Sequence, residues 1–269
     1  MAAADCYFPA GGADLRYRDA GRGPPIVFVH GWSLDLDMWE PQVTALLASH
    51  RVIRWDRRGF GLSGGRPGIE SDVADVRALC QHLDIQRAAF VGMSQGVRVI
   101  CALAVTEPSL ISCLVLDGSP DLTGYPGLTA NDVPIDRYRA LVRDRDVEVF
   151  RWEWQAHPMA QLRTREHSVN ELLRTMLARY PATDLLQMQT AGTETPMLEA
   201  LIAARIAALV INGEFDLHTR KEAGKTLARA LPGSQYVSIP DAGHLPNLDN
   251  PAAYNAVLRD FLGRKQPHL

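Results

Sequence analysis

The sequence lacks any apolar run close to the length of a membrane span. A transmembrane helix needs roughly 20 predominantly apolar residues, and the apolar stretches of this 269-residue chain are much shorter. The first residues, MAAADCYFPAGG, also lack the basic start and the long apolar segment of a secretory signal. We therefore expect a cytoplasmic protein that does not bind membranes.

An excess of charge of one sign is also missing. Lysine and arginine number 28, aspartate and glutamate number 31, and the net charge is −3. A balance this close gives no electrostatic reason to expect nucleic acid as a partner. The sequence carries no signal for an oligomeric state.

Cysteine is scarce, with four residues in the whole chain. Their spacing contains no CxxC pair or other arrangement typical of metal binding, so we predict no metal site. Three of them (Cys80, Cys101 and Cys113) lie in apolar stretches, where a buried free thiol is the expected state.

The chain does have a regular alternation of short apolar runs and longer helical patterns. Runs rich in β-branched residues predict strands at 25–31, 51–56, 88–92, 111–118, 208–216 and 235–244. Two shorter pieces around Gly11 and Gly12 predict an N-terminal hairpin. Helical patterns between the first four of these strands indicate an α/β fold, with a largely parallel sheet between two layers of helices. In such folds, sites gather at the carboxyl ends of the strands.

The alternation is interrupted by a segment without strong strand signals. A loop rich in proline and glycine is followed there by amphipathic, helix-like stretches. We predict a helical cap at 120–203, inserted between two parts of the core at 1–119 and 204–269. Within the cap, FRWEWQAHPM is rich in aromatic residues, and Trp152 or Trp154 would suit a pocket for a hydrophobic acyl or aromatic group.

Ser94 is the candidate nucleophile. It stands in GMSQG, directly after an apolar strand and before a helical pattern, which is the context that a G-x-S-x-G turn requires. The turn is so sharp that the residues two before and two after the serine come close together, and Gly92 and Gly96 have no Cβ to clash there. The alternative is a small polar residue in an ordinary tight turn.

A serine hydroxyl needs a base, and His244 is the best placed of the eight histidines. It lies on the loop after the last predicted strand, where it can reach over the nucleophile. Asp216, at the end of the preceding strand, is the candidate acid that orients His244, and the order Ser, Asp, His along the chain favours it. Asp117 ends another strand at the same edge and is a competitor for this role.

An oxyanion intermediate would need hydrogen-bond donors. We expect them to be the backbone N–H groups of Gln95, which follows the nucleophile, and of Trp32, in the loop after the strand at 25–31. His30 and Gly31 are expected to shape that loop rather than to contact substrate.

These motifs together resemble the α/β-hydrolase superfamily over nearly the whole chain. The matching pieces are HGW at 30–32, DRRGFGLS at 56–63, GMSQG at 92–96, GEFD at 213–216 and AGH at 242–244. The stretch DAGHLPNLDNP is most similar to bacterial esterases and enol-lactonase-type enzymes with a helical cap. The resemblance implies a mostly parallel eight-stranded sheet, a Ser94–His244–Asp216 triad, and Asp56 with Arg57 or Arg58 in buried polar contacts.

One position departs from the pattern of many members, which have a second glycine after the motif where this chain has Val97. Arg98 follows it, and we interpret Arg98 as a solvated helix residue, with binding of an acidic substrate as the alternative.

The function expected from these residues is that of a serine hydrolase without a cofactor, cleaving a carboxylic ester or lactone of a small, hydrophobic substrate. The same triad can serve C–C bond hydrolysis, perhydrolysis, hydroxynitrile cleavage or cofactor-free dioxygenation, and Asp117 slightly favours the last. A ligand receptor with slow turnover is a further alternative.

Overall fold

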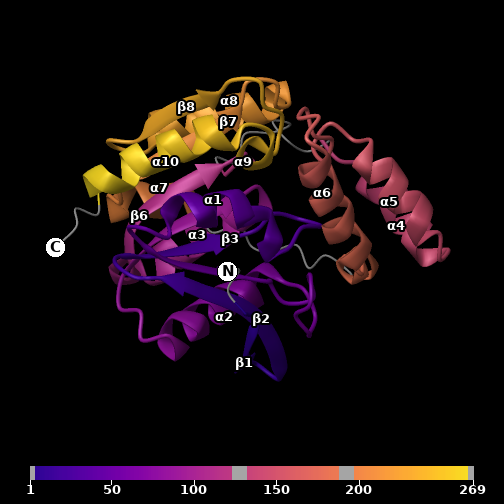
Figure 1. Ribbon diagram of the computed structural model, residues 1–269, viewed down its shortest axis with the longest axis horizontal. Coiled ribbons are helices and arrows are strands. Elements are labelled where there is room, and N and C mark those ends of the chain that lie inside the picture. The colour runs from indigo at the N-terminus through magenta and orange to yellow at the C-terminus, as the bar shows by residue number, and fades with distance from the viewer. Residues whose placement is uncertain (1–3, 123–131, 188–196, 266–269) are drawn as a thin grey trace.

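The computed structural model describes residues 4–122, 132–187 and 197–265, and an eight-stranded sheet forms its centre (Figure 1). The strands lie in the order β1-β2-β4-β3-β5-β6-β7-β8. Only the pairs of β1 with β2 and of β2 with β4 are antiparallel, and the others are parallel. The strands are β1 (Cys6–Ala10), β2 (Ala13–Gly21), β3 (Pro25–Val29), β4 (Arg51–Trp55), β5 (Ala88–Met93), β6 (Ile111–Asp117), β7 (Ala208–Gly213) and β8 (Gln235–Ile239). The predicted fold, including the N-terminal hairpin, is confirmed.

The middle strands are buried on both faces, which explains their unbroken apolar sequences. Every residue of β5 and of β7 is buried. Along β3, Ile26 and Phe28 join the core on one face, whereas Val27 and Val29 join the core on the other. A strand with both faces covered needs apolar residues at successive positions rather than alternate ones.

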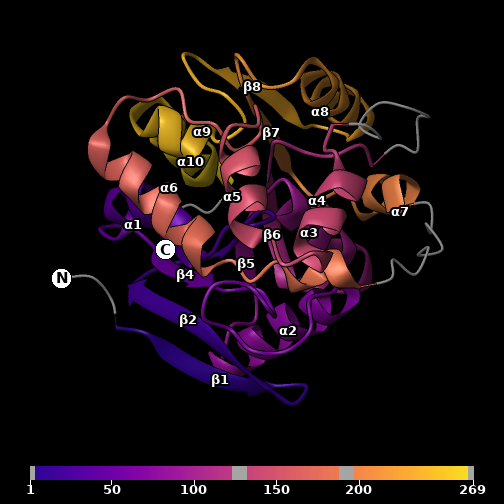
Figure 2. The same cartoon turned by 90° about the vertical axis from the view of Figure 1, so that its right-hand side faces the viewer.

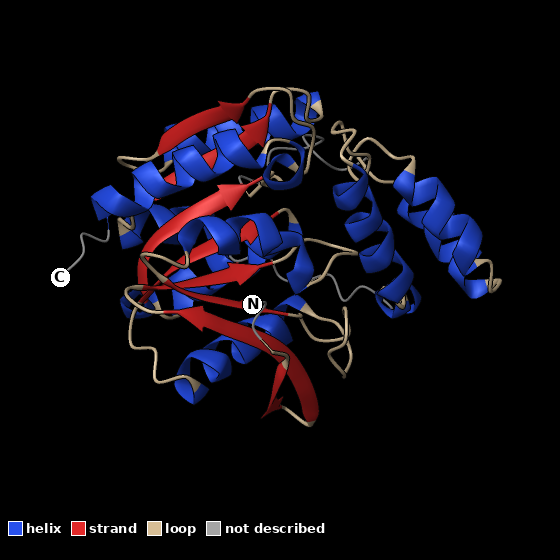
Figure 3. Cartoon of the chain, in the orientation of Figure 1, coloured by secondary structure: helices blue, strands red, loops and turns tan. Residues whose placement is uncertain are grey.

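Helices cover both faces of the sheet (Figure 3). The core on one face takes side chains from η1 (Leu36–Trp39), α1 (Glu40–Leu46), α9 (Pro246–Asp249) and α10 (Pro251–Lys265). The core on the other takes them from α2 (Ile69–His82), α3 (Gln95–Thr106), α7 (Met197–Ala204) and α8 (His218–Ala230). A short turn, η2 (Pro108–Leu110), joins α3 to β6. None of the helices in the described ranges is long and apolar enough to cross a membrane.

The described parts of the segment between β6 and β7 consist of helices joined by loops, without strands. They contain α4 (Ile135–Arg143), α5 (Val147–Gln155), α6 (His167–Arg179), η3 (Thr183–Leu186) and α7. Figure 1 shows α4, α5 and α6 beyond the ends to which the parallel strands point, and Figure 2, viewed from that side, shows them in front of the sheet. The last helix, α7, packs instead against α3. Most of the proline- and glycine-rich loop that the sequence predicts before α4 lies outside the described residues.

The parallel strands therefore end at one edge of the sheet, which we call the carboxyl edge, and α4 to α6 lie over it (Figures 1 and 2). β5, β6, β7 and β8 are neighbours there. Residues that directly follow these four strands are consequently brought close together although they are far apart in the sequence.

Candidate active site

Ser94 lies in a strained turn between β5 and α3. Its φ of 50° and ψ of −112° fall in a region that side chains other than glycine rarely adopt. A Cβ on Gly92 would lie 2.7 Å from the carbonyl oxygen of Gly96, and a Cβ on Gly96 would lie 2.3 Å from that of Val29. Both glycines are thus required by the close approach of the backbone, as the sequence predicts.

Asp216 and His244 are in direct contact at the carboxyl edge. The Nδ1 of His244 donates to Oδ1 of Asp216 at 2.9 Å, and both side chains are buried. The carboxylate also accepts from Nδ2 of Asn212 at 2.9 Å and from the N–H of Leu217 at 2.8 Å. Burial raises the pKa of Asp216, but the charge of His244 and these hydrogen bonds outweigh it, so the pKa lies below the ordinary value. An ionised Asp216 holds the proton of neutral His244 on Nδ1 and leaves Nε2 as the basic nitrogen.

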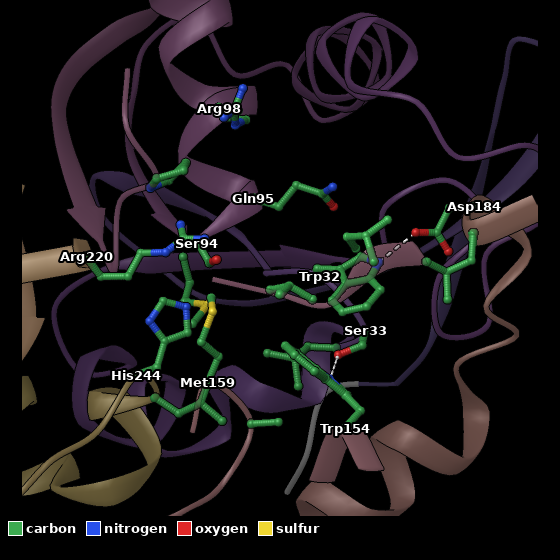
Figure 4. A pocket seen from close by; sticks show the side chains of 18 of the residues that line it. Trp32, Ser33, Ser94, Gln95, Arg98, Trp154, Met159, Asp184, Arg220 and His244 are labelled. Carbon is green, nitrogen blue, oxygen red and sulfur yellow. Dashed lines mark hydrogen bonds between the residues drawn. The ribbon is translucent and has the colours of Figure 1, made fainter. Parts of the chain in front are cut away.

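Ser94 and His244 line the same cavity, which has a volume of about 350 Å³ (Figure 4). Within the part of the chain that the structure describes, Nε2 of His244 is buried and has no hydrogen-bond partner, and no hydrogen bond joins the two side chains. The structure therefore brings Asp216 and His244 into contact and places Ser94 beside them on the cavity wall.

Asp117, the competitor for the role of the acid, lies at the same edge of the sheet but makes no hydrogen bond to His244. Its carbonyl oxygen accepts from the N–H of Ser94 at 2.7 Å, and its side chain is fully buried. Burial and the negative charge of Asp216 raise the pKa of Asp117 well above its usual value, against a smaller lowering by the hydroxyl of Tyr254. His244 is therefore paired with Asp216, and Asp117 is a buried acid that favours its neutral form.

The N–H groups of Trp32 and Gln95 lie at the two loops that border the nucleophile. Neither donates to another backbone group of the described chain. The side chain of Gln95 is turned aside, because its Oε1 accepts from Nη1 of Arg57 at 2.7 Å. His30 is buried and links two loops, with Nδ1 bonded to the carbonyl oxygen of Gly31 and Nε2 accepting from the N–H of Arg57. Burial, followed by the charge of Arg57, lowers the pKa of His30 well below its usual value, so His30 is a neutral structural residue.

The DRRG loop supports the site through buried polar contacts, as expected. Arg57 donates twice to Asp72, at 2.9 and 2.6 Å, and Arg58 donates to both oxygens of Asp75. Asp56 accepts from two backbone N–H groups, each at 2.8 Å. These pairs fix the loop whose backbone holds His30.

Two indole groups connect the loop at 30–35 to the helices above it, a pair of contacts that we call the indole clamp. Nε1 of Trp32 donates to Asp184 of η3 at 2.6 Å, and Nε1 of Trp154 of α5 donates back to Ser33 at 2.7 Å. Tyr180 donates its hydroxyl to the other oxygen of Asp184. Ser33 has a φ of 62°, so the clamp acts on a strained part of the loop.

Asp184, Tyr180 and Ser33 were not predicted from the sequence. The tryptophans give one general signal, because a buried indole N–H needs a hydrogen-bond acceptor. The sequence pattern does not identify which residue provides that acceptor. Of the two tryptophans that the sequence offers, Trp154 lines the cavity, whereas Trp152 is 72% exposed and does not. Trp152 points away because it lies on the outer side of α5.

The rest of the cavity wall is mixed in character. Its apolar members are Trp32, Leu34, Met93, Pro120, Val133, Ile135, Trp154, Met159, Ala160, Leu185 and Leu245, and its charged members besides His244 are Arg98, Arg139, Asp184 and Arg220. Arg98 is therefore a half-buried residue of the cavity wall and not the solvated helix residue that its position in the sequence indicates.

The cysteines take no part in this site. Cys80, Cys101 and Cys113 are buried free thiols, as predicted, and burial raises the pKa of Cys80 and of Cys101 to about 12. Among the described residues, no group of three or more histidine, cysteine, aspartate or glutamate side chains could hold a metal ion.

Proteins that are similar to this chain in sequence or structure are named as several different enzymes. A Mycobacterium tuberculosis protein named a non-heme bromoperoxidase, BpoC, is 32% identical over 266 residues, which cover 92% of this chain and 97% of that protein. The solved structure of a thermophilic esterase from Thermogutta terrifontis with malate bound is 29% identical, with a TM-score of 0.79, covering 98% of this chain and 100% of that one. The enol-lactonase from Burkholderia xenovorans is 28% identical, with a TM-score of 0.71, covering 96% and 99%.

The family model of the alpha/beta hydrolase fold matches residues 24–251, which contain Ser94, Asp216 and His244. The sheet order, the strained turn after β5 and the matches to esterases and an enol-lactonase agree with it, and together they support hydrolase activity. This chain belongs to the α/β-hydrolase fold family.

Proposed function

We propose that this protein is a serine hydrolase that cleaves a carboxylic ester or lactone of a small molecule through an acyl-enzyme on Ser94. One observation carries the proposal. The buried Asp216–His244 pair directs a basic Nε2 into the same cavity that receives the hydroxyl of Ser94. Similarity to proteins named esterase and enol-lactonase supports the substrate class.

In the first half of the reaction, His244 accepts the proton of Ser94 while the serine oxygen attacks the carbonyl carbon. The N–H groups of Trp32 and Gln95 bind the oxyanion that forms. His244 then passes its proton to the leaving alcohol, which departs and leaves the acyl group on Ser94. Catalytic hydrogen bonds are often long in free enzymes and shorten when substrate binds. The absence of a hydrogen bond between the side chains of Ser94 and His244 is therefore compatible with these steps.

In the second half, water enters the cavity and His244 takes one of its protons as the water oxygen attacks the acyl carbon. The same two N–H groups bind the second oxyanion. Collapse of this intermediate releases the carboxylic acid and returns the proton to Ser94. Asp216 stabilises the positive imidazolium in both halves and does not itself change protonation.

We also propose that residues 120–203 act as a cap that selects the substrate, between core parts at 1–119 and 204–269. The described residues of this segment supply much of the cavity wall, including Trp154, Met159 and Leu185. These side chains suit a hydrophobic body of a small substrate.

The proposed function is tested with a panel of esters, lactones and 1,3-diketones assayed with wild type, Ser94→Ala and Ser71→Ala. Ser71 is an exposed serine on α2 and serves as the matched control. We expect steady turnover of esters or lactones that falls by at least roughly a thousandfold in Ser94→Ala alone. Turnover confined to the diketones would favour C–C bond hydrolysis, and a single burst with a stable adduct would favour a ligand receptor.

Perhydrolysis is a second candidate, because the chain is 32% identical to a protein named a non-heme bromoperoxidase. In this reaction, hydrogen peroxide replaces water in the attack on the acyl-enzyme, and the products are a peracid and regenerated Ser94. The peracid would oxidise bromide in solution, which a halogen-trapping dye reports. Bromination that requires both an ester and peroxide, and that is lost in Ser94→Ala, would support this second activity.

A further inference from the structure

Three of the residues that line the cavity are arginines, and they come from three different helices. Arg98 belongs to α3, Arg139 to α4 and Arg220 to α8. Arg139 is paired with the exposed Asp136 of its own helix at 3.3 Å. Arg220 is buried and paired with Asp132, whereas Arg98 has no acidic partner among the described residues. A cavity for purely hydrophobic substrates does not explain why these two cations line it.

Arg220 is about nine-tenths buried and points into the cavity. Figure 4 shows its side chain reaching from α8 toward Ser94. The Nε atom donates to Asp132 at 2.7 Å, which fixes the guanidinium plane. Within the described part of the chain, its two terminal nitrogens have no acceptor. A buried guanidinium group that is held at one side and left open at the other is prepared to bind an anion.

Arg98 is the second cation of this subsite. It follows Ser94 by four positions, so it lies one turn further along the same side of α3. It is half-buried, lines the cavity, and makes no hydrogen bond or ion pair with any described residue. Burial is the main cause that lowers the pKa of Arg220, against the raising effects of Asp132 and Asp216, and the charge of Arg98 adds a smaller lowering.

Both arginines also lie near the N-terminus of a helix, where a positive charge is unfavourable. Arg98 is in the first turn of α3 and Arg220 is in the first turn of α8. The exposed N–H groups of a helix N-terminus carry partial positive charge, so anions are stabilised there and cations are not. Asp132 and Asp216 offset part of the charge of Arg220, so the uncompensated positive charge on this side of the cavity comes mainly from Arg98 and the N-terminus of α3. Asp184, the acidic residue of the wall, lies on the other side of Trp32 and is already bonded to Trp32 and Tyr180 (Figure 4).

We propose that the substrate carries a carboxylate group in addition to its ester or lactone carbonyl, and that Arg220 and Arg98 bind this carboxylate. The proposal rests on the proposed hydrolase function and narrows its substrate class to acidic esters or lactones. The apolar residues of the wall would hold the body of the substrate between the two polar ends.

The test compares carboxylate esters with their neutral amide isosteres near neutral pH. One pair carries the acid on the acyl side (monoethyl adipate and its primary amide), and the other carries it on the alcohol side (carboxymethyl hexanoate and carbamoylmethyl hexanoate). Acid release gives kcat/KM for wild type, Arg98→Met, Arg220→Lys and Arg229→Met. Arg229 is an exposed arginine of α8 and is the matched control for loss of a positive charge.

We expect wild type to prefer the acid in at least one pair by roughly tenfold to a hundredfold, the range for a charge-assisted hydrogen bond to a buried group. Arg98→Met and Arg220→Lys should each reduce this preference, and Arg229→Met should preserve it. Equal kcat/KM for acid and amide in both pairs would overturn the carboxylate subsite, while steady turnover of the amide esters would leave the proposed hydrolase intact.

If none of these esters is cleaved, the result counts against the proposed hydrolase function but does not test the carboxylate subsite. A binding measurement tests the subsite in that case. Titration calorimetry compares adipate with its monoamide on Ser94→Ala, with and without Arg98→Met. Tighter binding of adipate, with the difference reduced by Arg98→Met, supports the subsite. Equal binding of the two compounds overturns it.

Discussion

Two aspartates lie close to Ser94, and their surroundings give them opposite ionisation. Asp216 accepts hydrogen bonds from His244, Asn212 and a backbone N–H, which stabilise its anion. Burial and the charge of Asp216 raise the pKa of Asp117, and the hydroxyl of Tyr254 offsets this only in part, so the neutral form of Asp117 is favoured. Of the two candidates in the sequence, Asp216 is therefore the one that can stabilise an imidazolium.

Substitution of each aspartate by asparagine separates their roles. We expect Asp216→Asn to lower kcat for ester hydrolysis by roughly a thousandfold or more, because an amide cannot hold His244 in the correct tautomer. Asp117→Asn should keep kcat within about threefold, because the amide imitates the neutral acid. Comparable losses in the two variants would show that Asp117 shares the acid role.

The same pair makes opposite contributions to stability as the pH changes. Asp117 keeps a proton in the folded state that the unfolded chain releases above a pKa of 3.8. Its contribution to the free energy of unfolding therefore decreases as the pH rises above about 4. Asp117→Asn cannot titrate, so its stability relative to wild type should rise as the pH increases above about 4, by at most about 1.4 kcal/mol per pH unit.

Asp216→Asn is the control for this measurement, because the folded state lowers the pKa of Asp216. The stability that its ionised form contributes is present above the ordinary pKa of 3.8 and is lost as the pH falls through the lower folded-state value. This variant should therefore be less stable than wild type near neutral pH and should approach it in acid. Urea unfolding at several pH values measures both differences, and equal slopes for the two variants would contradict the assigned ionisation.

At the scale of elements, the indole clamp joins the loop at 30–35 to the helices that lie over the carboxyl edge. Trp32 and Asp184 are 152 positions apart, and Ser33 and Trp154 are 121 positions apart. Because the N–H of Trp32 is the proposed oxyanion donor, the clamp would hold this donor in place through residues that do not touch the reacting atoms. Ser33, Trp154 and Asp184 are positioning residues in this sense.

A double-mutant cycle tests the clamp. Trp154→Phe and Ser33→Ala each remove one end of the same hydrogen bond, so we expect kcat to fall by roughly threefold to thirtyfold with a smaller change in KM. The double variant should be no worse than either single variant. Trp152→Phe, at an exposed position of the same helix, is the control and should resemble wild type. Additive losses, or an effect on KM alone, would rule out a positioning role.

Gly96 determines how closely two elements pack. Because it has no Cβ, α3 can begin directly against β3. A Cβ at this position would lie 2.3 Å from the carbonyl oxygen of Val29 and 2.8 Å from that of His30. Because both contacts are with backbone, Gly96→Ala should destabilise the fold by several kcal/mol, at the upper end of single substitutions. Thermal unfolding measures the loss. Gly263→Ala, where a Cβ has open space in the last helix, should be neutral or slightly stabilising.

For the whole molecule, the mostly parallel sheet and the places of Ser94, Asp216 and His244 after their strands could be predicted because they depend on local patterns, whereas the order of the strands in the sheet could not. Strands buried on both faces leave unbroken apolar runs, and the sharp turn leaves its glycines. The sequence favours Asp216 over Asp117, and the three-dimensional structure shows the contact of Asp216 with His244 directly. Both residues end neighbouring strands, and only the path of the loop after β8 decides which of them meets His244.

The contacts made by the helices between β6 and β7 could not be predicted, because they depend on how these helices are placed over the sheet. Asp184, Ser33 and Arg220 acquire their roles when α4 to α6 are placed over the carboxyl edge, and no periodicity in the sequence encodes that placement. Arg98 shows this most clearly. In the sequence it is a polar position on a helix, whereas in the folded molecule it lines the cavity beside Ser94.

The central claim is that a covalent acyl group forms on Ser94 during turnover. The most direct test is mass spectrometry of wild-type protein quenched in acid during steady hydrolysis of an ester, followed by mapping of the modified peptide. We expect a mass increase equal to the acyl group, located on Ser94 and absent from Ser94→Ala. Steady hydrolysis without this adduct on Ser94, or an adduct that persists in Ser94→Ala, would contradict it.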